Sequence, residues 1–187
     1  MADGVGGDAG LDVVGAIGPK LPIGTYEEAL TWVGRESTVL FSPMPVNECR
    51  IKTFVALLQD GNRSYWDPRA YESVWSGHPA PPGMLLTWLM PLCWHPDGAE
   101  KLLPLLTRVP LPGRTLINVE TDTEFHRPVF IGDRLNRVER ILGVSEEKRT
   151  RLGVGHFVSS VAHYRDQAGV EVATESMQML RYEPGEG

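Results

Sequence analysis

Cysteine is scarce in this chain of 187 residues, which contains only Cys49 and Cys93. The two thiols show neither the close spacing of a metal-ligand motif nor the even series of a disulfide framework, and both lie within apolar helical patterns. We therefore expect two buried free thiols in a reducing compartment and no bound metal.

Positive charge and long apolar runs are also lacking. Lys and Arg number 18 against 24 Asp and Glu, and the net charge of −6 argues against a nucleic-acid partner, which would need a basic stripe. No stretch approaches the roughly 18 uninterrupted apolar residues of a membrane-spanning helix. The apolar run of residues 11–17 is interrupted by Asp12 and Gly15 and follows no basic segment, which is unlike a secretion signal or an anchor. We expect a cytoplasmic protein with no membrane partner.

An apolar fraction of 42% and a charged fraction of 22% are typical of a soluble globular protein. Residues 1–24 are rich in glycine and show no periodicity, so they predict a flexible N-terminal tail. Residues 25–187 are within the usual length of one domain, and we expect a single one.

Two helices are predicted in the first half of the chain. Asn47 is a good N-cap, and apolar residues follow it at helical spacing: Ile51, Phe54, Val55 and Leu58. Asp67 followed by Pro68 marks the start of a second, short helix that runs to about Trp75.

A third helix is predicted from Pro82 to Trp94. Residues 84–94 (MLLTWLMPLCW) carry no charge, and a helix that is apolar on every side is a buried one. Pro91 predicts a kink, or an end near Met90, because proline cannot donate a helical hydrogen bond.

The periodicity changes from helical to two in the second half. Strands are predicted over residues 116–125, 135–144, 156–164 and 170–182, with a hairpin connection at Asp166–Gly169 and an earlier strand ending at Phe41. An antiparallel sheet must cover one of its faces, and the apolar helix is the candidate cover. The sequence therefore predicts an α+β fold in which the sheet wraps around one long buried helix.

This layout, over residues 46–183, resembles the hot-dog fold, and two local motifs narrow the resemblance. Residues 124–133 (EFHRPVFIGD) resemble the F-x-x-P-V-x-x-G-D strand and turn of MaoC-like hydratases and dehydratases. Residues 80–84 (APPGM) resemble the segment that opens the central helix in that group. The branch most similar has a FAS1-like dehydratase domain and supplies the partner subunit of heteromeric (R)-hydroxyacyl dehydratases and steroid enoyl-CoA hydratases.

The resemblance implies a catalytic motif, G-D-x-N-P-x-H, whose Asp and His hold the reacting water. The matching residues here are 59–65 (QDGNRSY), which keep Asp60 and Asn62 but place Tyr65 where the family has His. A phenol with a reference pKa of about 10 is a poor general base at neutral pH. Asp60 can equally be an ordinary turn residue. His78 is the best substitute, since its loop leads to the predicted helix, although a structural role is open for it too.

The resemblance also implies that a backbone N–H at the start of the central helix polarises the thioester carbonyl. Pro82 has no N–H, so Gly83 and Met84 would hold the first donors. Trp88 would line an acyl tunnel, and Arg63 or Arg127 would bind phosphates of coenzyme A or a carrier protein. A solvated surface charge remains the alternative for each arginine.

Two hypotheses follow. The first is an enoyl-thioester hydratase or (R)-3-hydroxyacyl dehydratase component for a bulky acyl group, paired as a homodimer or heterodimer with a second hot-dog chain that supplies the intact Asp and His. The second is a catalytically silent acyl-CoA-binding module. A hot-dog thioesterase is disfavoured because the apolar helix has no carboxylate, although Glu72 or Asp60 could approach from a loop. No cofactor is expected beyond the thioester substrate.

Overall fold

The computed structural model describes residues 21–92, 94, 96 and 103–185. Most of the predicted tail, residues 1–20, lies outside the described residues, as does Cys93. The tail and its boundary with the domain therefore stay predictions. No helix in the described ranges is long and apolar enough to cross a membrane.

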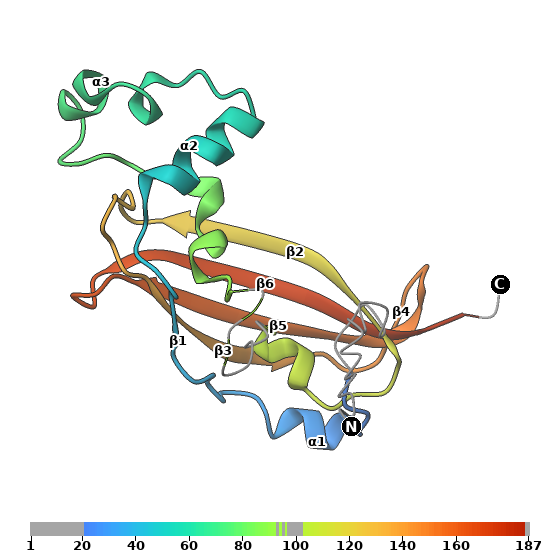
Figure 1. Cartoon of the computed structure of the whole chain (residues 1–187). Helices are drawn as coiled ribbons and strands as arrows, with labels where there is room; N and C mark the ends of the chain where they lie inside the picture. The colour runs from blue at the N-terminus through green and yellow to red at the C-terminus, as the bar shows by residue number, and fades with distance from the viewer. Residues whose placement is uncertain (1–20, 93, 95, 97–102, 186–187) are drawn as a thin grey trace, which may run out of the picture.

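One curved antiparallel sheet forms the body of the molecule (Figure 1). Its strands are β1 (Leu40–Phe41), β2 (Thr115–Phe125), β3 (Asn136–Val144), β4 (Lys148–Arg149), β5 (Gly153–Arg165) and β6 (Glu171–Pro184). Their spatial order is β1-β3-β5-β6-β2, with β4 paired to β5 off this path. All four predicted long strands are confirmed.

Alternation along β5 shows which face of the sheet is covered. Val158, Ser160, Ala162 and Tyr164 are buried, whereas the residues between them are half-exposed. Successive side chains of a strand point to opposite faces, so the buried set marks the inner face, toward the helices.

The predicted hairpin between β5 and β6 is also confirmed. The Asp166 carboxylate accepts the backbone N–H groups of Ala168 at 2.8 Å and Val170 at 2.9 Å, and Gly169 takes a φ of 80° that glycine adopts easily.

Helices cover the two ends of the inner face. The N-terminal one, α1 (Tyr26–Leu30), lies at one end, and α2 (Glu48–Leu57) and α3 (Pro68–Glu72) project as an overhang at the other (Figure 1). Asn47 caps α2 by accepting the Arg50 N–H at 3.0 Å, as predicted. The second predicted helix ends at Glu72 rather than at about Trp75.

The central helix is shorter than predicted. Instead of one helix from Pro82 to Trp94, the chain forms two short 3₁₀ helices, η2 (Pro82–Met84) and η3 (Leu86–Leu89). Met90 is already extended, with ψ of 122°, because the ring of a following proline disfavours the helical conformation. Trp94, predicted to be buried, is 74% exposed. The end near Met90 that Pro91 predicts is confirmed, whereas the helix beyond it is wrong.

Two apolar clusters lie on the inner face of the sheet. The first packs η2, η3 and α2 against one end and includes Ile51, Val55, Met84, Trp88 and Leu89. The second packs α1 and a further 3₁₀ helix, η4 (Leu105–Arg108), against the other end through Ala29, Leu105, Leu106, Ile141 and Val158.

A buried polar band separates the two clusters. Arg137 donates to Glu139 at 3.0 Å, Tyr164 donates to Glu175 at 3.0 Å, and Ser160 donates to the other oxygen of Glu139 at 2.8 Å. The band fixes η4 as well, because the Leu105 N–H donates to Glu139 at 2.7 Å. These polar groups are satisfied by one another, as burial requires.

The two edges of the sheet differ. Along β3, residues 34–42 supply backbone partners, including the Ser37 N–H to Glu139 at 2.8 Å and the Gly34 N–H to Ile141 at 2.9 Å. At the opposite edge, β2 pairs on one side only, with β6, in the part of the chain that the structure describes.

Candidate functional site

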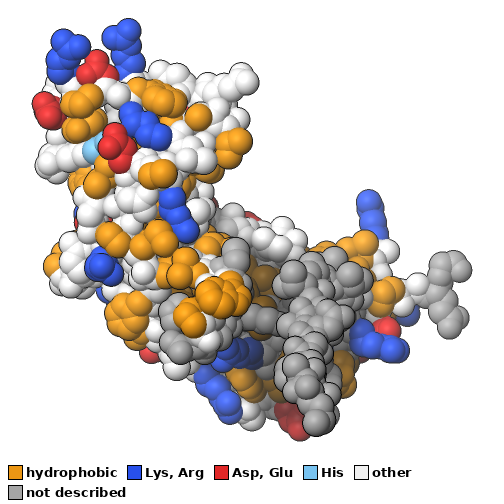
Figure 2. Space-filling model, viewed as in Figure 1, with side chains coloured by type: hydrophobic (Ala, Val, Ile, Leu, Met, Phe, Trp, Pro, Cys, Tyr) orange, Lys and Arg blue, Asp and Glu red, His pale blue; other side chains and the backbone are white. Residues whose placement is uncertain are grey.

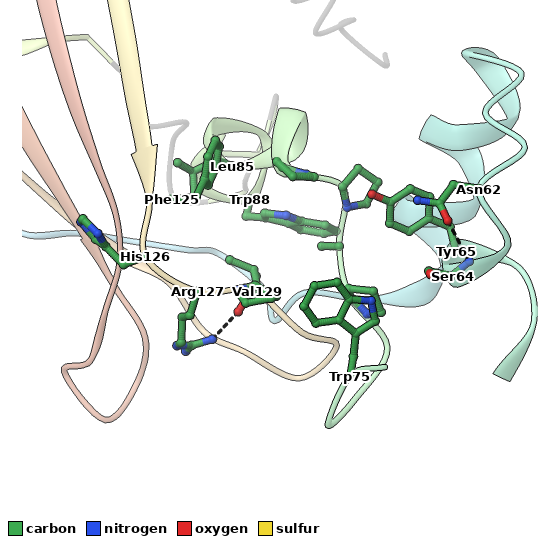
Figure 3. Close-up of a pocket in the computed structure, with 15 residues that line it drawn as sticks. Asn62, Ser64, Tyr65, Trp75, Leu85, Trp88, Phe125, His126, Arg127 and Val129 are labelled. Atoms are coloured by element: carbon green, nitrogen blue, oxygen red, sulfur yellow. Dashed lines mark hydrogen bonds between the residues drawn. The ribbon is translucent and has the colours of Figure 1, made fainter. Parts of the chain in front are cut away.

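A cavity of about 340 Å³ lies where the overhang meets the inner face of the sheet. Figure 3 shows rings of Tyr65, Trp75 and Trp88 grouped around the same space. Phe125 and Val129 line it from the sheet side, and four prolines complete much of the wall: Pro79, Pro81, Pro82 and Pro128. A cavity of this size with mostly apolar walls and a few polar groups is typical of a small-molecule site.

Trp88 connects the cavity to the protein core. Its side chain is only 1% exposed and belongs to the same apolar cluster as Met84 and Leu89, yet it also lines the cavity. Leu85, from the link between η2 and η3, lies beside it. Trp88 is therefore placed where it could line an acyl tunnel, and this role remains a proposal.

Asp60 and Asn62 shape the turn between α2 and α3, within the overhang. Asp60 accepts the Asn62 N–H at 2.9 Å, and Asn62 accepts the Ser64 N–H at 3.1 Å to begin the 3₁₀ helix η1 (Arg63–Tyr65). Asn62 lines the cavity, whereas Asp60 does not. The carboxylate predicted to hold a reacting water thus acts as a turn residue beside the site.

Tyr65 places its ring in the cavity wall (Figure 3). Burial raises the pKa of its phenol above the ordinary 10.0, and the nearby Asp60 carboxylate raises it further. At neutral pH the phenol therefore keeps its proton and can donate a hydrogen bond, but it is not a base.

His78 does not line the cavity. Its ring stacks on Tyr71 with the centroids 4.6 Å apart, and its Nε2 has no partner among the described residues. Burial lowers the pKa of this imidazole, and the effect of burial is larger than the opposite effect of the Glu48 carboxylate. His78 thus lies just behind the cavity wall formed by Tyr65 and Pro79, and its catalytic role stays a prediction.

The start of η2 retains one of the two predicted backbone donors. The Met84 N–H is committed, since it donates to Pro81 at 2.9 Å, and the Met84 side chain is buried in the core. Gly83 is exposed, and Pro82 lines the cavity. Gly83 itself is not among the residues that line the cavity, so its role as donor to a thioester carbonyl stays a prediction.

The two arginines of the prediction have different surroundings. Arg127 lines the cavity, but its guanidinium donates to Pro128 at 2.6 Å, to Asp133 at 3.2 Å and to Asp166. These contacts close the turn after β2, so the predicted phosphate-binding role of Arg127 is not favoured. Arg63 is exposed and lies outside the cavity lining, on the overhang. Figure 2 shows basic and hydrophobic side chains interspersed there.

His126 is the histidine that lines the cavity in the described ranges. Its Nε2 lies 2.9 Å from the Thr174 hydroxyl and 3.5 Å from the Glu171 carboxylate, and Figure 3 shows the ring turned away from the cavity. Phe125, which sequence reasoning missed as a lining residue, precedes it. The F-x-x-P spacing to Pro128 was the available signal, because it places Phe125 at the end of a strand beside the turn.

The described lining thus offers apolar walls and hydrogen-bond donors but no carboxylate. In the same part of the chain, no group of three or more His, Cys, Asp or Glu side chains is placed to hold a metal ion. Such a site can bind an acyl group and donate to a carbonyl, but it lacks an evident base.

Comparison with known proteins agrees with this geometry. The family described as "FAS1-like, dehydratase domain region" matches residues 31–175. The chain belongs to this family. A relative from Thermomonospora curvata, described as a probable enoyl-CoA hydratase alpha subunit, is 34% identical over 173 residues, which cover 85% of this chain and 52% of the relative. The chain therefore spans about half the length of the curated relative that it matches.

Solved structures show the same fold. A chain in the crystal structure of the ChsH1–ChsH2 complex from Mycobacterium tuberculosis has a TM-score of 0.70 at 21% identity, covering 86% of this chain and 93% of that one. The (R)-hydratase from A. caviae involved in PHA biosynthesis has a TM-score of 0.53 at 18% identity, covering 81% of this chain and 96% of that one. The predicted hot-dog fold of this MaoC-like family member is confirmed.

Proposed function

We propose that this chain is the acyl-binding subunit of an enoyl-thioester hydratase or (R)-3-hydroxyacyl-thioester dehydratase for bulky acyl groups. A second hot-dog chain supplies the catalytic Asp and His. The family relationship and the description of the Thermomonospora curvata relative as a hydratase subunit support the reaction class.

The observation that carries the proposal is a cavity suited to an acyl group but lacking a base. Syn hydration needs one group to activate water and one to deliver a proton to the α-carbon. Tyr65 holds its own proton, His126 is turned toward Thr174 and Glu171, and the described lining has no carboxylate. The missing groups must therefore come from outside this lining.

The open edge of β2 gives a second chain access to the cavity. Phe125, the last residue of β2, and the two residues that follow it line the cavity wall. An edge strand with unpaired backbone groups is a template for another strand. A partner that extends the sheet along β2 would thus bring its own side chains toward the cavity.

Two alternatives make different demands on the site. A hot-dog thioesterase of the expected kind needs a carboxylate on or beside the central helix, and η2 and η3 carry none. Neither Glu72 nor Asp60 lines the cavity, which disfavours this reaction further. A silent acyl-CoA-binding module needs only the cavity itself, so binding and turnover must be measured separately.

Calorimetric titration of the isolated chain with saturated acyl-CoAs, from butyryl-CoA to a polycyclic acyl-CoA, tests the binding part. We expect dissociation constants on the order of micromolar, tighter for the larger acyl groups. The matching enoyl-CoAs should bind without being hydrated. If none of the acyl-CoAs binds, the proposal is wrong.

A matched pair of variants locates the binding. Trp75→Leu removes a ring from the cavity wall, whereas Trp94→Leu removes an exposed ring that does not line it. We expect the first variant to weaken acyl-CoA binding and the second to leave it unchanged. Equal effects of the two would place the ligand elsewhere.

A further inference from the structure

The outer edge of β2 carries a row of negative charge in addition to its open backbone. Glu120, Asp122 and Glu124 are exposed and alternate along the strand, so all three point to the same, outer face of the sheet. A register shift between Asn118 and Glu120 marks the start of this segment.

Nothing on the neighbouring strand neutralises the row. The residues of β6 opposite the three carboxylates are Gln178, Ser176 and Thr174, which are all uncharged. Among the described residues, the ion pair that involves one of these three carboxylates joins Glu124 to His126 at 4.0 Å. This contact is attractive only when the histidine is protonated.

The row opposes pairing of this edge with a second copy of the chain. A symmetric dimer formed by adding β2 to β2 would be antiparallel about a two-fold axis, with the outer faces continuous. Any such register centred between residues 120 and 124 sets a carboxylate opposite a carboxylate. Like charges directly opposite one another destabilise a strand pair, and opposite charges stabilise it.

The other edge of the sheet does not share this arrangement. Residues 34–42 already occupy the β3 side with backbone hydrogen bonds, so an added strand has little access there. Of the two edges, β2 is the one that combines unpaired backbone groups with a row of negative charge.

We infer that the β2 edge selects a partner strand with Lys or Arg at alternate positions on its outer face, and that it disfavours a second copy of this chain in every register centred between residues 120 and 124. The inference rests on the proposed role as one subunit of a pair, and it adds the charge that distinguishes the partner strand. Charge of the opposite sign gives specificity as well as affinity at such an edge.

Charge reversal tests the inference without the natural partner. The triple variant Glu120→Lys, Asp122→Lys, Glu124→Lys supplies a basic β2 edge on the same fold. Sedimentation velocity is measured on the wild-type chain, on the variant and on their 1:1 mixture at low ionic strength. We expect association in the mixture roughly a hundredfold tighter than in either protein alone. It should weaken in about 1 M salt, where charges are screened beyond about 3 Å.

A control with the same change in net charge is available away from β2. Glu72, Glu146 and Glu147 are also exposed, and changing all three to Lys should produce no association with the wild-type chain. The inference is wrong if this control associates equally well, if the first mixture stays monomeric, or if the wild-type chain self-associates as tightly as the mixture. Circular dichroism confirms that each variant is folded. No acyl ligand takes part, so a failure here leaves the acyl-CoA titration as a separate test of the proposed function.

Discussion

The two halves of the inner face of the sheet are built differently, although the same strands run beneath both. At the overhang, Trp88 and Leu85 pack on the core but leave a cavity above them. At the other end, α1 and η4 cover the sheet, and the polar band through Arg137, Glu139 and Glu175 separates this cluster from the cavity half.

This difference teaches that a residue of the covered half can affect stability alone, whereas a residue of the cavity wall can affect both stability and ligand binding. Fully buried apolar residues stabilise the fold in both halves, and the polar band between them adds satisfied ionic contacts. The cavity half leaves the rings of Trp75 and Phe125 partly exposed at the cavity wall, where a bound ligand would cover them. Variants in each half should therefore separate the two properties.

The largest expected effect combines both properties in one residue. Trp88→Ala should lower the free energy of unfolding by about 3 to 5 kcal/mol, because a large buried ring is removed. It should also deepen the cavity, so that the folded protein accepts longer acyl groups. Urea denaturation and acyl-CoA titration of the variant measure the two effects. Unchanged chain-length preference would show that Trp88 does not limit the cavity.

Glu139→Ala should be comparably destabilising without affecting binding. Removing a buried carboxylate that accepts from Arg137, Ser160 and Leu105 leaves these donors unpaired, at a cost of about 3 to 5 kcal/mol. Glu139→Gln keeps the shape and should cost less. Loss of acyl-CoA affinity in the folded Glu139→Ala protein would contradict the separation of the two halves.

Acidification should weaken the turn that supports the cavity wall. Burial alone would raise the pKa of Asp166, but hydrogen bonds from Val170, Arg127 and Ala168 outweigh it and hold the pKa below the ordinary 3.8. A carboxyl group whose pKa is lower in the folded than in the unfolded protein stabilises the fold at pH values above its unfolded-state pKa. This contribution is lost as the pH falls through the folded-state pKa. The Asp166→Asn variant should lack this contribution of the ionised carboxylate, so its free energy of unfolding at neutral pH should be lower by about 1 to 3 kcal/mol. The difference in unfolding free energy between the two proteins, followed from pH 7 to pH 2, should shrink toward acid.

The smallest change in stability is expected for Tyr65→Phe. The ring stays, so the free energy of unfolding should change by less than about 0.5 kcal/mol. If the hydroxyl donates to the thioester, binding should weaken about three- to tenfold, as for one neutral hydrogen bond. A change in stability with no change in affinity would assign Tyr65 a structural role instead.

Local patterns predicted the parts of this fold that local interactions determine. The alternation of β5 and the capping of α2 by Asn47 depend on neighbouring residues, and both were predictable. The length of the central helix was overestimated because the prediction relied on the apolar composition of residues 84–94. The conformational restriction that Pro91 imposes on Met90 ends the helical segment earlier.

The site was harder to predict because its contacts join distant residues. Arg127 was expected to bind phosphate, but its partner Asp166 lies 39 positions away, beyond any local spacing. The covering of the far half by η4 was missed for the same reason, since Leu105 is held by Glu139 through a contact 34 positions apart. The hydrogen bond from the Asn62 N–H to the Asp60 carboxylate supports the alternative that Asp60 is a turn residue, and its catalytic role stays a prediction.

The most direct test of the central claim asks which chain supplies the catalytic carboxylate. The chain is co-purified with a short hot-dog protein that carries an intact G-D-x-N-P-x-H motif, and hydration of a bulky enoyl-CoA is followed. Replacing the motif Asp of that partner by Asn should reduce kcat by about 10²- to 10⁴-fold, whereas Asp60→Asn in this chain should leave it unchanged. Hydration by this chain alone that disappears in Asp60→Asn would contradict the account.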